Sequence, residues 1–242
     1  MRMLGRRPTR ITWPGQSRET IAFSMCYSDV MRGVLITVEG VEGSGKTTQC
    51  ERLGQWLRAR GHEVVLTSEP DGTRLGAAIR GLFEQESGPP TPLTQTFLFM
   101  AARQQHVTEI IRPALQRGAV VISDRYADAT LAYQGWGGGM DIETIRDLNA
   151  LATGGVTPDL TLLLDLDPAA GMSRIGGRAL DAFEKMDLAF HRRVREGYLE
   201  IARAEKNRVR VLDAGRDAAT LHADVVRGVE ELLERRRVGR GA

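Results

Sequence analysis

The chain has 242 residues, of which 42% are hydrophobic and 26% are charged, as expected of a soluble globular domain rather than a disordered chain. Its formal net charge is +2, but residues 1–33 hold six arginines and two acidic residues, so the rest is mildly acidic, which argues against a general nucleic-acid-binding surface. No apolar run approaches the roughly 18 residues of a membrane span. The two cysteines, Cys26 and Cys50, give no disulfide framework, which is usual in a reducing compartment. We therefore expect a cytoplasmic protein that binds neither nucleic acid nor membrane.

The first 32 residues differ from the rest of the sequence. They contain Pro8, Pro14 and scattered arginines, follow neither a helical nor a strand period, and lack the continuous apolar segment of a secretory signal. We expect a disordered extension, or an upstream start with Met31 as the natural beginning; a functional basic arm is the alternative. The predicted divisions are an extension over residues 1–32, a folded domain over 33–236 and a basic tail over 237–242.

The remaining sequence alternates between short strands and helices. β-Branched and aliphatic runs predict five strands, over residues 33–38, 63–68, 119–124, 160–165 and 209–213. Periodicity and cap residues predict helices over residues 47–60, 75–83, 92–117, 127–134, 141–153 and 218–232, with a glycine-rich turn over 135–139. This alternation indicates an α/β fold in which a five-stranded parallel sheet is covered by helices on both faces.

The turn between the first strand and the first helix matches the phosphate-binding pattern G-x-x-x-x-G-K-[ST] at every position. Its residues are Gly40, Val41, Glu42, Gly43, Ser44, Gly45, Lys46 and Thr47. A glycine-rich turn of this kind points successive backbone N–H groups into one concavity at a helix N-terminus. Lys46 can reach the β- and γ-phosphates, and the Thr47 hydroxyl can bind Mg²⁺. The sequence therefore predicts a P-loop NTPase three-layer fold that binds a nucleoside triphosphate with Mg²⁺.

The third predicted strand ends in Asp124-Arg125-Tyr126. A carboxylate at this place, beside a phosphate loop, can hold the water shell of Mg²⁺ in the manner of a Walker B aspartate. The Arg125 guanidinium can neutralise the charge of a phosphoryl group and donate two parallel N–H hydrogen bonds to its oxygens. An ordinary strand-end aspartate beside a surface arginine would look the same, so the tripeptide alone does not decide between the two.

Further motifs follow in a fixed order. Glu69-Pro70-Asp71-Gly72-Thr73 comes after the second strand, Leu98-Phe99-Met100-Ala101-Ala102-Arg103 lies in the long helix, and Ala132-Tyr133-Gln134-Gly135 comes after Tyr126. Together with the loop Glu-Gly-x-Glu-Gly-Ser-Gly-Lys-Thr-Thr they resemble bacterial thymidylate kinases over about residues 33–233. The resemblance implies transfer of the ATP γ-phosphoryl group to dTMP, giving dTDP and ADP, by a homodimer packed through helices that include the one from Pro92.

The resemblance also implies roles for individual residues. Phe99 would stack on the thymine ring, while Arg103 and Gln134 would hydrogen-bond its edges, with Thr130 nearby. Without the resemblance, Phe99 on an apolar helical face would be ordinary core, and Arg103 one turn later an ordinary solvated charge.

The acceptor's charged groups would be met by another set of residues. Arg80 and Arg125 would hold the acceptor phosphate, which is a dianion that two arginines can offset. Glu42 would face the 3′-hydroxyl of the acceptor sugar, and Glu69 would orient the sugar and the metal-bound water. Because the acceptor is already an anion, no strong general base is needed, and positioning with charge neutralisation would carry the catalysis.

Residues 174–186 resemble a basic, aperiodic lid that excludes water when it closes. Arg174 and Arg178 are the candidates to contact the ATP phosphates and, with Lys46 and Arg125, the predicted catalytic residues. Ala182 stands where the family commonly has an arginine, which leaves open a catalytically impaired P-loop relative that works as a switch or scaffold. A monophosphate kinase for another pyrimidine nucleotide such as dUMP is a second open alternative. The four histidines show no metal-ligand spacing and receive no catalytic part.

Overall fold

The computed structural model of the chain describes residues 32–83, 90–176 and 182–239. The predicted extension before Arg32, the lid residue Arg178 and the last three residues of the basic tail lie outside this part of the chain. Among the described helices, none is long and apolar enough to cross a membrane.

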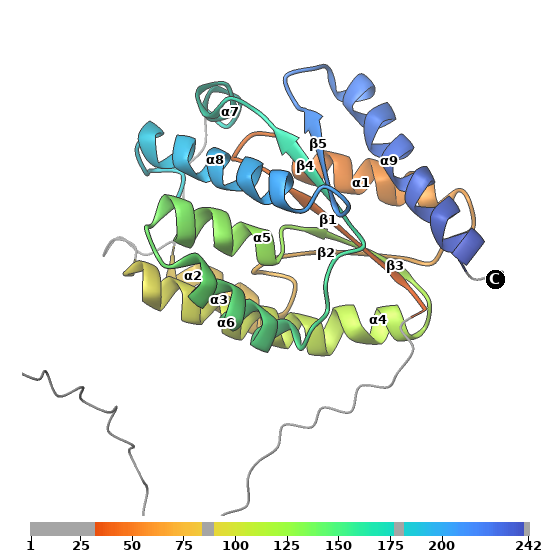
Figure 1. The fold of residues 1–242 in the computed structure, drawn as a ribbon, viewed down its shortest axis with the longest axis horizontal. Coiled ribbons are helices and arrows are strands. Elements are labelled where there is room, and N and C mark those ends of the chain that lie inside the picture. The colour runs from red at the N-terminus through yellow and green to blue at the C-terminus, as the bar shows by residue number, and fades with distance from the viewer. Residues whose placement is uncertain (1–31, 84–89, 177–181, 240–242) are drawn as a thin grey trace, which may run out of the picture.

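A five-stranded parallel sheet forms the centre of the fold, with the strand order β2-β3-β1-β4-β5 (Figure 1). The strands are β1 (Val34–Glu39), β2 (Val64–Ser68), β3 (Val120–Asp124), β4 (Leu160–Asp165) and β5 (Val209–Asp213). The predicted α/β fold with its parallel sheet is therefore confirmed. β4 and β5 have the predicted bounds, β2 and β3 begin one residue later than predicted, and β1 is shifted by one residue at both ends.

Helices cover both faces of this sheet (Figure 1). The α-helices are α1 (Lys46–Arg58), α2 (Arg74–Leu82), α3 (Pro92–His106), α4 (Arg112–Gln116), α5 (Ala127–Thr130), α6 (Ile142–Thr153), α7 (Pro168–Arg174), α8 (Leu188–Ala204) and α9 (Ala218–Gly239). Two π-helical segments, η1 (Val107–Ile111) and η2 (Leu131–Gly137), continue α3 and α5. Residues 237–239 of the predicted basic tail continue α9.

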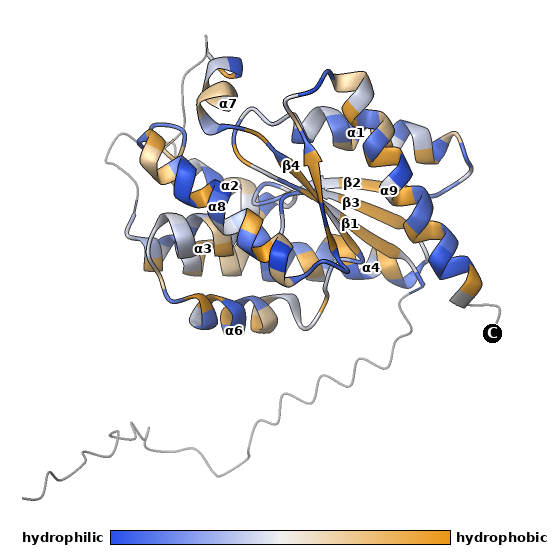
Figure 2. Cartoon of the chain, turned by 45° about the horizontal axis from the view of Figure 1, so that its top comes forward, coloured by the Kyte–Doolittle hydropathy of each residue, from blue (hydrophilic) through white to orange (hydrophobic). Residues whose placement is uncertain are grey.

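Alternation along the strands divides the core between the two faces. Ile36 and Val38 pack with Leu53 of α1 and Val225 of α9, whereas Leu35 packs in a second cluster with residues of η1 and α4. Both clusters are buried, and the strands carry the most continuous hydrophobic colour in Figure 2. A two-sided apolar sheet of this kind leaves only its strand ends for polar chemistry.

The long predicted helix is one continuous rod built from α3, η1 and α4. It begins at Pro92, with the Thr91 side chain accepting a hydrogen bond from the Thr94 backbone N–H, and it ends before Gly118, whose φ is +91°. Thr91 and Gly118 therefore terminate it as predicted.

The predicted glycine turn over residues 135–139 is wrong in its first half, because Gly135 to Gly137 lie within η2. A Cβ on Gly135 would lie 2.5 Å from Ile142 Cδ1, and one on Gly137 would lie 2.7 Å from the Phe190 ring. These glycines allow η2 to approach α6 and α8 closely. Helices α7 and α8 were not among the predicted elements, and Arg174, predicted in an aperiodic lid, is the last residue of α7.

Candidate active site

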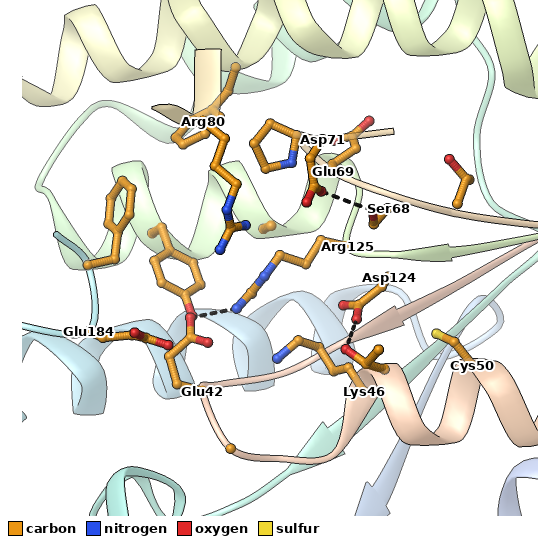
Figure 3. A pocket seen from close by; sticks show the side chains of 18 of the residues that line it. Glu42, Lys46, Cys50, Ser68, Glu69, Asp71, Arg80, Asp124, Arg125 and Glu184 are labelled. Atoms are coloured by element: carbon orange, nitrogen blue, oxygen red, sulfur yellow. Dashed lines mark hydrogen bonds and ion pairs between the residues drawn. The ribbon is translucent and has the colours of Figure 1, made fainter. Parts of the chain in front are cut away.

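A cleft of about 850 Å³ opens where β1, β2 and β3 end, and the phosphate loop forms one wall of it (Figure 3). The opposite wall comes from α2, α3 and η2. Among the residues that line the cleft are Glu42, Gly43, Gly45, Lys46, Thr47, Glu69, Arg80, Phe99, Arg103, Asp124, Arg125, Thr130, Gln134 and Arg174. The structure thus brings together residues that the sequence predicted for the ATP site and for the acceptor site.

Backbone geometry gives the phosphate loop its shape. Gly40, Gly43 and Gly45 have φ values of +143°, +68° and +89°, a region that favours glycine. A Cβ on Gly43 would lie 2.2 Å from the backbone oxygen of Gly171, so α7 packs directly on the loop. Lys46 Nζ lies within the turn and donates to the backbone oxygens of Gly40 at 3.1 Å and Val41 at 2.9 Å. The loop therefore offers a lysine and a helix N-terminus to an anion.

Thr47 and Asp124 meet across the loop from α1 and β3. Thr47 Oγ1 donates to Asp124 Oδ2 at 2.6 Å, as the dashed line in Figure 3 marks. In the described ranges, no three His, Cys, Asp or Glu side chains cluster as a metal site. One hydroxyl with one carboxylate fits Mg²⁺, which binds few protein ligands and completes its shell with phosphate oxygens and water.

Arg125 and Glu42 form an ion pair inside the cleft. Arg125 Nη2 donates to Glu42 Oε1 at 2.5 Å, and the hydroxyl of Tyr133 donates to the same oxygen at 2.7 Å. Burial raises the pKa of Glu42, but Arg125 and Lys46 outweigh burial and lower that pKa to about 2. Glu42 is therefore an anion at neutral pH, and it is held by groups that a phosphate could also engage.

Glu39 lies directly beneath the loop and has no exposed surface. Its Oε1 accepts from the backbone N–H of Tyr126 at 2.7 Å, and its Oε2 accepts from the Tyr198 hydroxyl at 2.8 Å. Burial, with a contribution from Asp128, raises the pKa of Glu39 to about 8. Glu39 and Glu42 are thus two carboxyl groups whose pKa values the fold shifts in opposite directions.

Arg103 is buried, and protein acceptors use all five of its N–H donors. Two N–H groups donate to Glu69 Oε2, at 2.9 and 2.6 Å; the others go to the Tyr126 carbonyl at 2.9 Å, Thr130 Oγ1 at 3.0 Å and Asn149 Oδ1 at 2.6 Å. To donate to a base, Arg103 must give up one of these partners. Thr130, which accepts from Arg103, keeps its own hydroxyl proton to donate.

His106 holds the other oxygen of Glu69. Its Nδ1 lies 3.2 Å from Glu69 Oε1, and its Nε2 lies 2.6 Å from Thr67 Oγ1. Burial raises the pKa of Glu69, but Arg103 and His106 outweigh burial and lower it. His106 received no part from the sequence, although its position one turn after Arg103 places it on the same side of α3.

The far wall of the cleft is aromatic. The rings of Phe83 and Phe99 are stacked, with centroids 5.0 Å apart and an interplanar angle of 13°, and Phe183 lies 5.9 Å from Phe99. Beside them, Gln134 donates its amide to Gln95 Oε1 at 3.1 Å. A flat apolar surface with an amide group beside it can bind a planar ring that carries polar groups along its edge.

Known proteins are similar to this chain in sequence and in fold. The sequence profile of thymidylate kinases matches residues 38–225. The thymidylate kinase of Deinococcus radiodurans is 49% identical over 201 residues, which cover 83% of this chain and 98% of that protein. The chain belongs to the thymidylate kinase family. The thymidylate kinase of Desulfovibrio desulfuricans is 45% identical over 217 residues, covering 86% of this chain and 99% of that protein.

A solved thymidylate kinase has the same fold. The crystal structure of the Ehrlichia chaffeensis thymidylate kinase matches with a TM-score of 0.68 and 35% identity, covering 81% of this chain and 98% of that chain. In the present chain, Arg174 lines the cleft, and its Nη1 donates to the backbone oxygens of Gly43 at 3.4 Å and Ala214 at 3.0 Å. These contacts join the end of α7 to the phosphate loop, and the predicted contact of Arg174 with the ATP phosphates stays a prediction.

Proposed function

We propose that this thymidylate kinase family member transfers the γ-phosphoryl group of ATP to the 5′-phosphate of dTMP, giving ADP and dTDP. The observation that carries the proposal is a single cleft with two different walls. One wall is a phosphate loop with Lys46, and the other is an aromatic and amide-bearing surface with Phe99 and Gln134. A protein that only bound one nucleotide would need only the first wall.

ATP is the proposed donor on the loop side. The N–H groups of residues 40–47 would cradle its phosphates, Lys46 would meet the β- and γ-phosphates, and Thr47 with water held by Asp124 would bind Mg²⁺. Mg²⁺ would neutralise charge on the phosphates being separated. Glu42 lies in the same loop but is paired with Arg125, so it faces the acceptor side of the cleft, where the acceptor's 3′-hydroxyl would lie.

dTMP is the proposed acceptor. Phe99 would stack on the thymine, and Gln134 with Thr130 would meet its polar edge. Because protein acceptors occupy every N–H donor of Arg103, its first proposed role is to hold Thr130 and Glu69 in place. To contact the base, Arg103 would have to exchange one of its protein acceptors for the base. A cytosine presents an amino donor where thymine has a carbonyl, so a donating Thr130 would favour thymine.

Arg125 and Arg80 are the proposed cations at the point of transfer. Figure 3 shows the Arg80 side chain reaching from α2 towards Arg125 inside the cleft. An oxygen of the acceptor phosphate would attack the γ-phosphorus in line, and the bond to the β-phosphate oxygen would break. Two guanidinium groups would offset the charge shared by the donor and acceptor phosphates.

We also infer a cytoplasmic homodimer. Leu93 and Phe97 lie four residues apart on one face of α3 and remain 50% and 55% exposed, an apolar surface that a second copy could cover. Cys50 is a buried free thiol, as suits a reducing compartment.

A panel of acceptors tests the proposal. ATP and Mg²⁺ would be incubated with dTMP, dUMP, dCMP or no acceptor, and ADP formation followed. We expect the highest kcat/KM with dTMP and little ADP without acceptor. A preference for dUMP would support the kinase of other specificity, and absence of ADP with every acceptor, while ATP still binds, would support the impaired relative.

A further inference from the structure

Tyr198 reaches the candidate active site from α8, an element outside the phosphate loop and the strand ends. It is buried, with 2% of its surface exposed. Its hydroxyl donates to Glu39 Oε2 at 2.8 Å and accepts from Arg125 Nη1 at 3.4 Å. One hydroxyl thus joins the buried carboxyl beneath the loop to the cation in the cleft.

The backbone of Arg125 is strained and closely held. Its φ of +72° makes it the one residue other than glycine with positive φ among the described ranges, a conformation that costs of order 1–3 kcal/mol. Three hydrogen bonds fix it: Arg125 N–H to Val38 O at 3.0 Å, Ser123 Oγ to Arg125 O at 2.7 Å, and Tyr126 N–H to Glu39 Oε1 at 2.7 Å. Glu39 therefore acts on Arg125 both through the next peptide and through Tyr198.

The partners of the Arg125 side chain differ in what a substrate does to them. Two of them, Glu42 and Gly40, belong to the phosphate loop. Arg125 Nη2 donates to Glu42, and an incoming phosphate would accept from this Nη2 in place of Glu42. Tyr198 is no part of that loop, so its contact with Nη1 can persist while the phosphate replaces Glu42.

We propose that Tyr198, held by Glu39, is a positioning residue that orients the Arg125 guanidinium for phosphoryl transfer. This rests on the proposed function, because it needs Arg125 at the reacting phosphates. Without the Tyr198 hydroxyl, the Arg125 guanidinium keeps its charge and its place in the cleft, but it is less well oriented toward the reacting phosphates. The effect therefore falls on kcat rather than on ATP binding.

Two variants that each remove one buried hydroxyl form a matched test. Tyr198→Phe removes the hydroxyl and keeps the ring, and it should lower kcat about tenfold with KM for ATP unchanged, the effect of one hydrogen bond to a charged group. Thr153→Val is the control, since Thr153 is also buried, does not line the cleft, and its hydroxyl donates to Ala150 O at 3.4 Å at the end of α6. It should keep kcat within about twofold of the wild type.

Coupling decides whether Tyr198 acts through Arg125. In an Arg125→Ala background, Tyr198→Phe should cause no further loss, whereas independent residues would give additive losses. Glu39→Asp has a shorter side chain, which cannot reach both the Tyr126 N–H and the Tyr198 hydroxyl, so it should show the same loss of kcat. This variant replaces Tyr198→Phe in the test if Tyr198→Phe does not fold. Wild-type kcat in Tyr198→Phe, an equal loss in Thr153→Val, or additive losses in the double variant would overturn the proposal. A wild-type chain without dTMP kinase activity would instead refute the proposed function.

Discussion

Arg125 donates to Glu42 Oε1 at 2.5 Å, so the cation that follows β3 is already paired with the carboxylate inside the phosphate loop. Both side chains are less than one-fifth exposed, at 19% and 18%, and loss of one partner leaves the other charge poorly solvated. A bound phosphate that replaces Glu42 would meet a cation already in place. The site is therefore organised by its own charges before a substrate enters.

Replacement of Arg125 by alanine tests this organisation. Turnover should fall by roughly 10³ or more, as for other cations that stabilise phosphoryl transfer. The thermal midpoint should fall, because Glu42 loses the partner of its charge. The chain should nevertheless keep its fold, because the backbone and Ser123 contacts that hold residue 125 at φ +72° remain intact.

Arg117→Ala is the control for that experiment. Arg117 also pairs with a glutamate, Glu63, but on the surface, with 48% and 56% of the side chains exposed. It should keep wild-type turnover. Near-normal turnover in Arg125→Ala would remove Arg125 from the site.

Phe99→Ala should weaken dTMP specifically. The substitution removes the ring stacked on Phe83 and the surface on which the base would lie. KM for dTMP should rise about tenfold or more, since an aromatic contact with a base is worth roughly 1–3 kcal/mol. KM for ATP should not change, and Phe99→Tyr, which keeps the flat ring, should stay near the wild type. Equal increases in both KM values would indicate general damage to the cleft.

The sequence predicted the phosphate loop and the sheet because their signals are local. A glycine pattern between a β-branched run and a capped helix needs no distant partner, and β4, buried on both faces, has its predicted bounds. The same local reasoning placed Gly135 in a turn. Tertiary packing against Ile142 decided otherwise, because a side chain there would collide.

Residues that act through distant contacts were missed for the same reason. Tyr198 lies 159 positions from Glu39 in sequence and meets it only because α8 packs over the sheet. Tyr133 belonged to a motif, but its contact with Glu42 depends on η2. Arg103 was predicted to contact a base, and the saturation of its donors became apparent only with Glu69 and Asn149 in place. The roles of the predicted site residues remain predictions.

Gly171→Ala should damage the ATP site from outside the loop. A Cβ there would lie 2.2 Å from the backbone oxygen of Glu42, so α7 and the loop would have to separate. Overpacking of this kind costs about 1–3 kcal/mol. We expect a lower thermal midpoint and a raised ATP dissociation constant by calorimetry.

Gly81→Ala provides the contrast. It lies in α2, and its Cβ would meet nothing within 4 Å, so helix propensity should leave stability equal or improved. Identical ATP affinity in Gly171→Ala and the wild type would show that the loop does not depend on α7.

Glu39 should give stability an unusual pH dependence. Its pKa is raised from 4.5 to about 8, so between these values the folded state binds more protons than the unfolded state. The contribution is fully present below pH 4.5 and is lost as the pH rises through about 8. Glu39→Gln lacks this titration, so its unfolding free energy should rise relative to the wild type as pH increases. Urea unfolding at about pH 5 and about pH 9 measures this, and a constant difference would contradict it.

The central claim is that one cleft holds donor and acceptor together and moves a phosphoryl group between them. ³¹P NMR of the chain with ATP, Mg²⁺ and dTMP measures this directly, because every phosphorus product is identified. We predict dTDP and ADP in equal amounts, with no accumulation of inorganic phosphate. ADP with inorganic phosphate and no dTDP would mean that the cleft hydrolyses ATP without an acceptor, and would contradict the account.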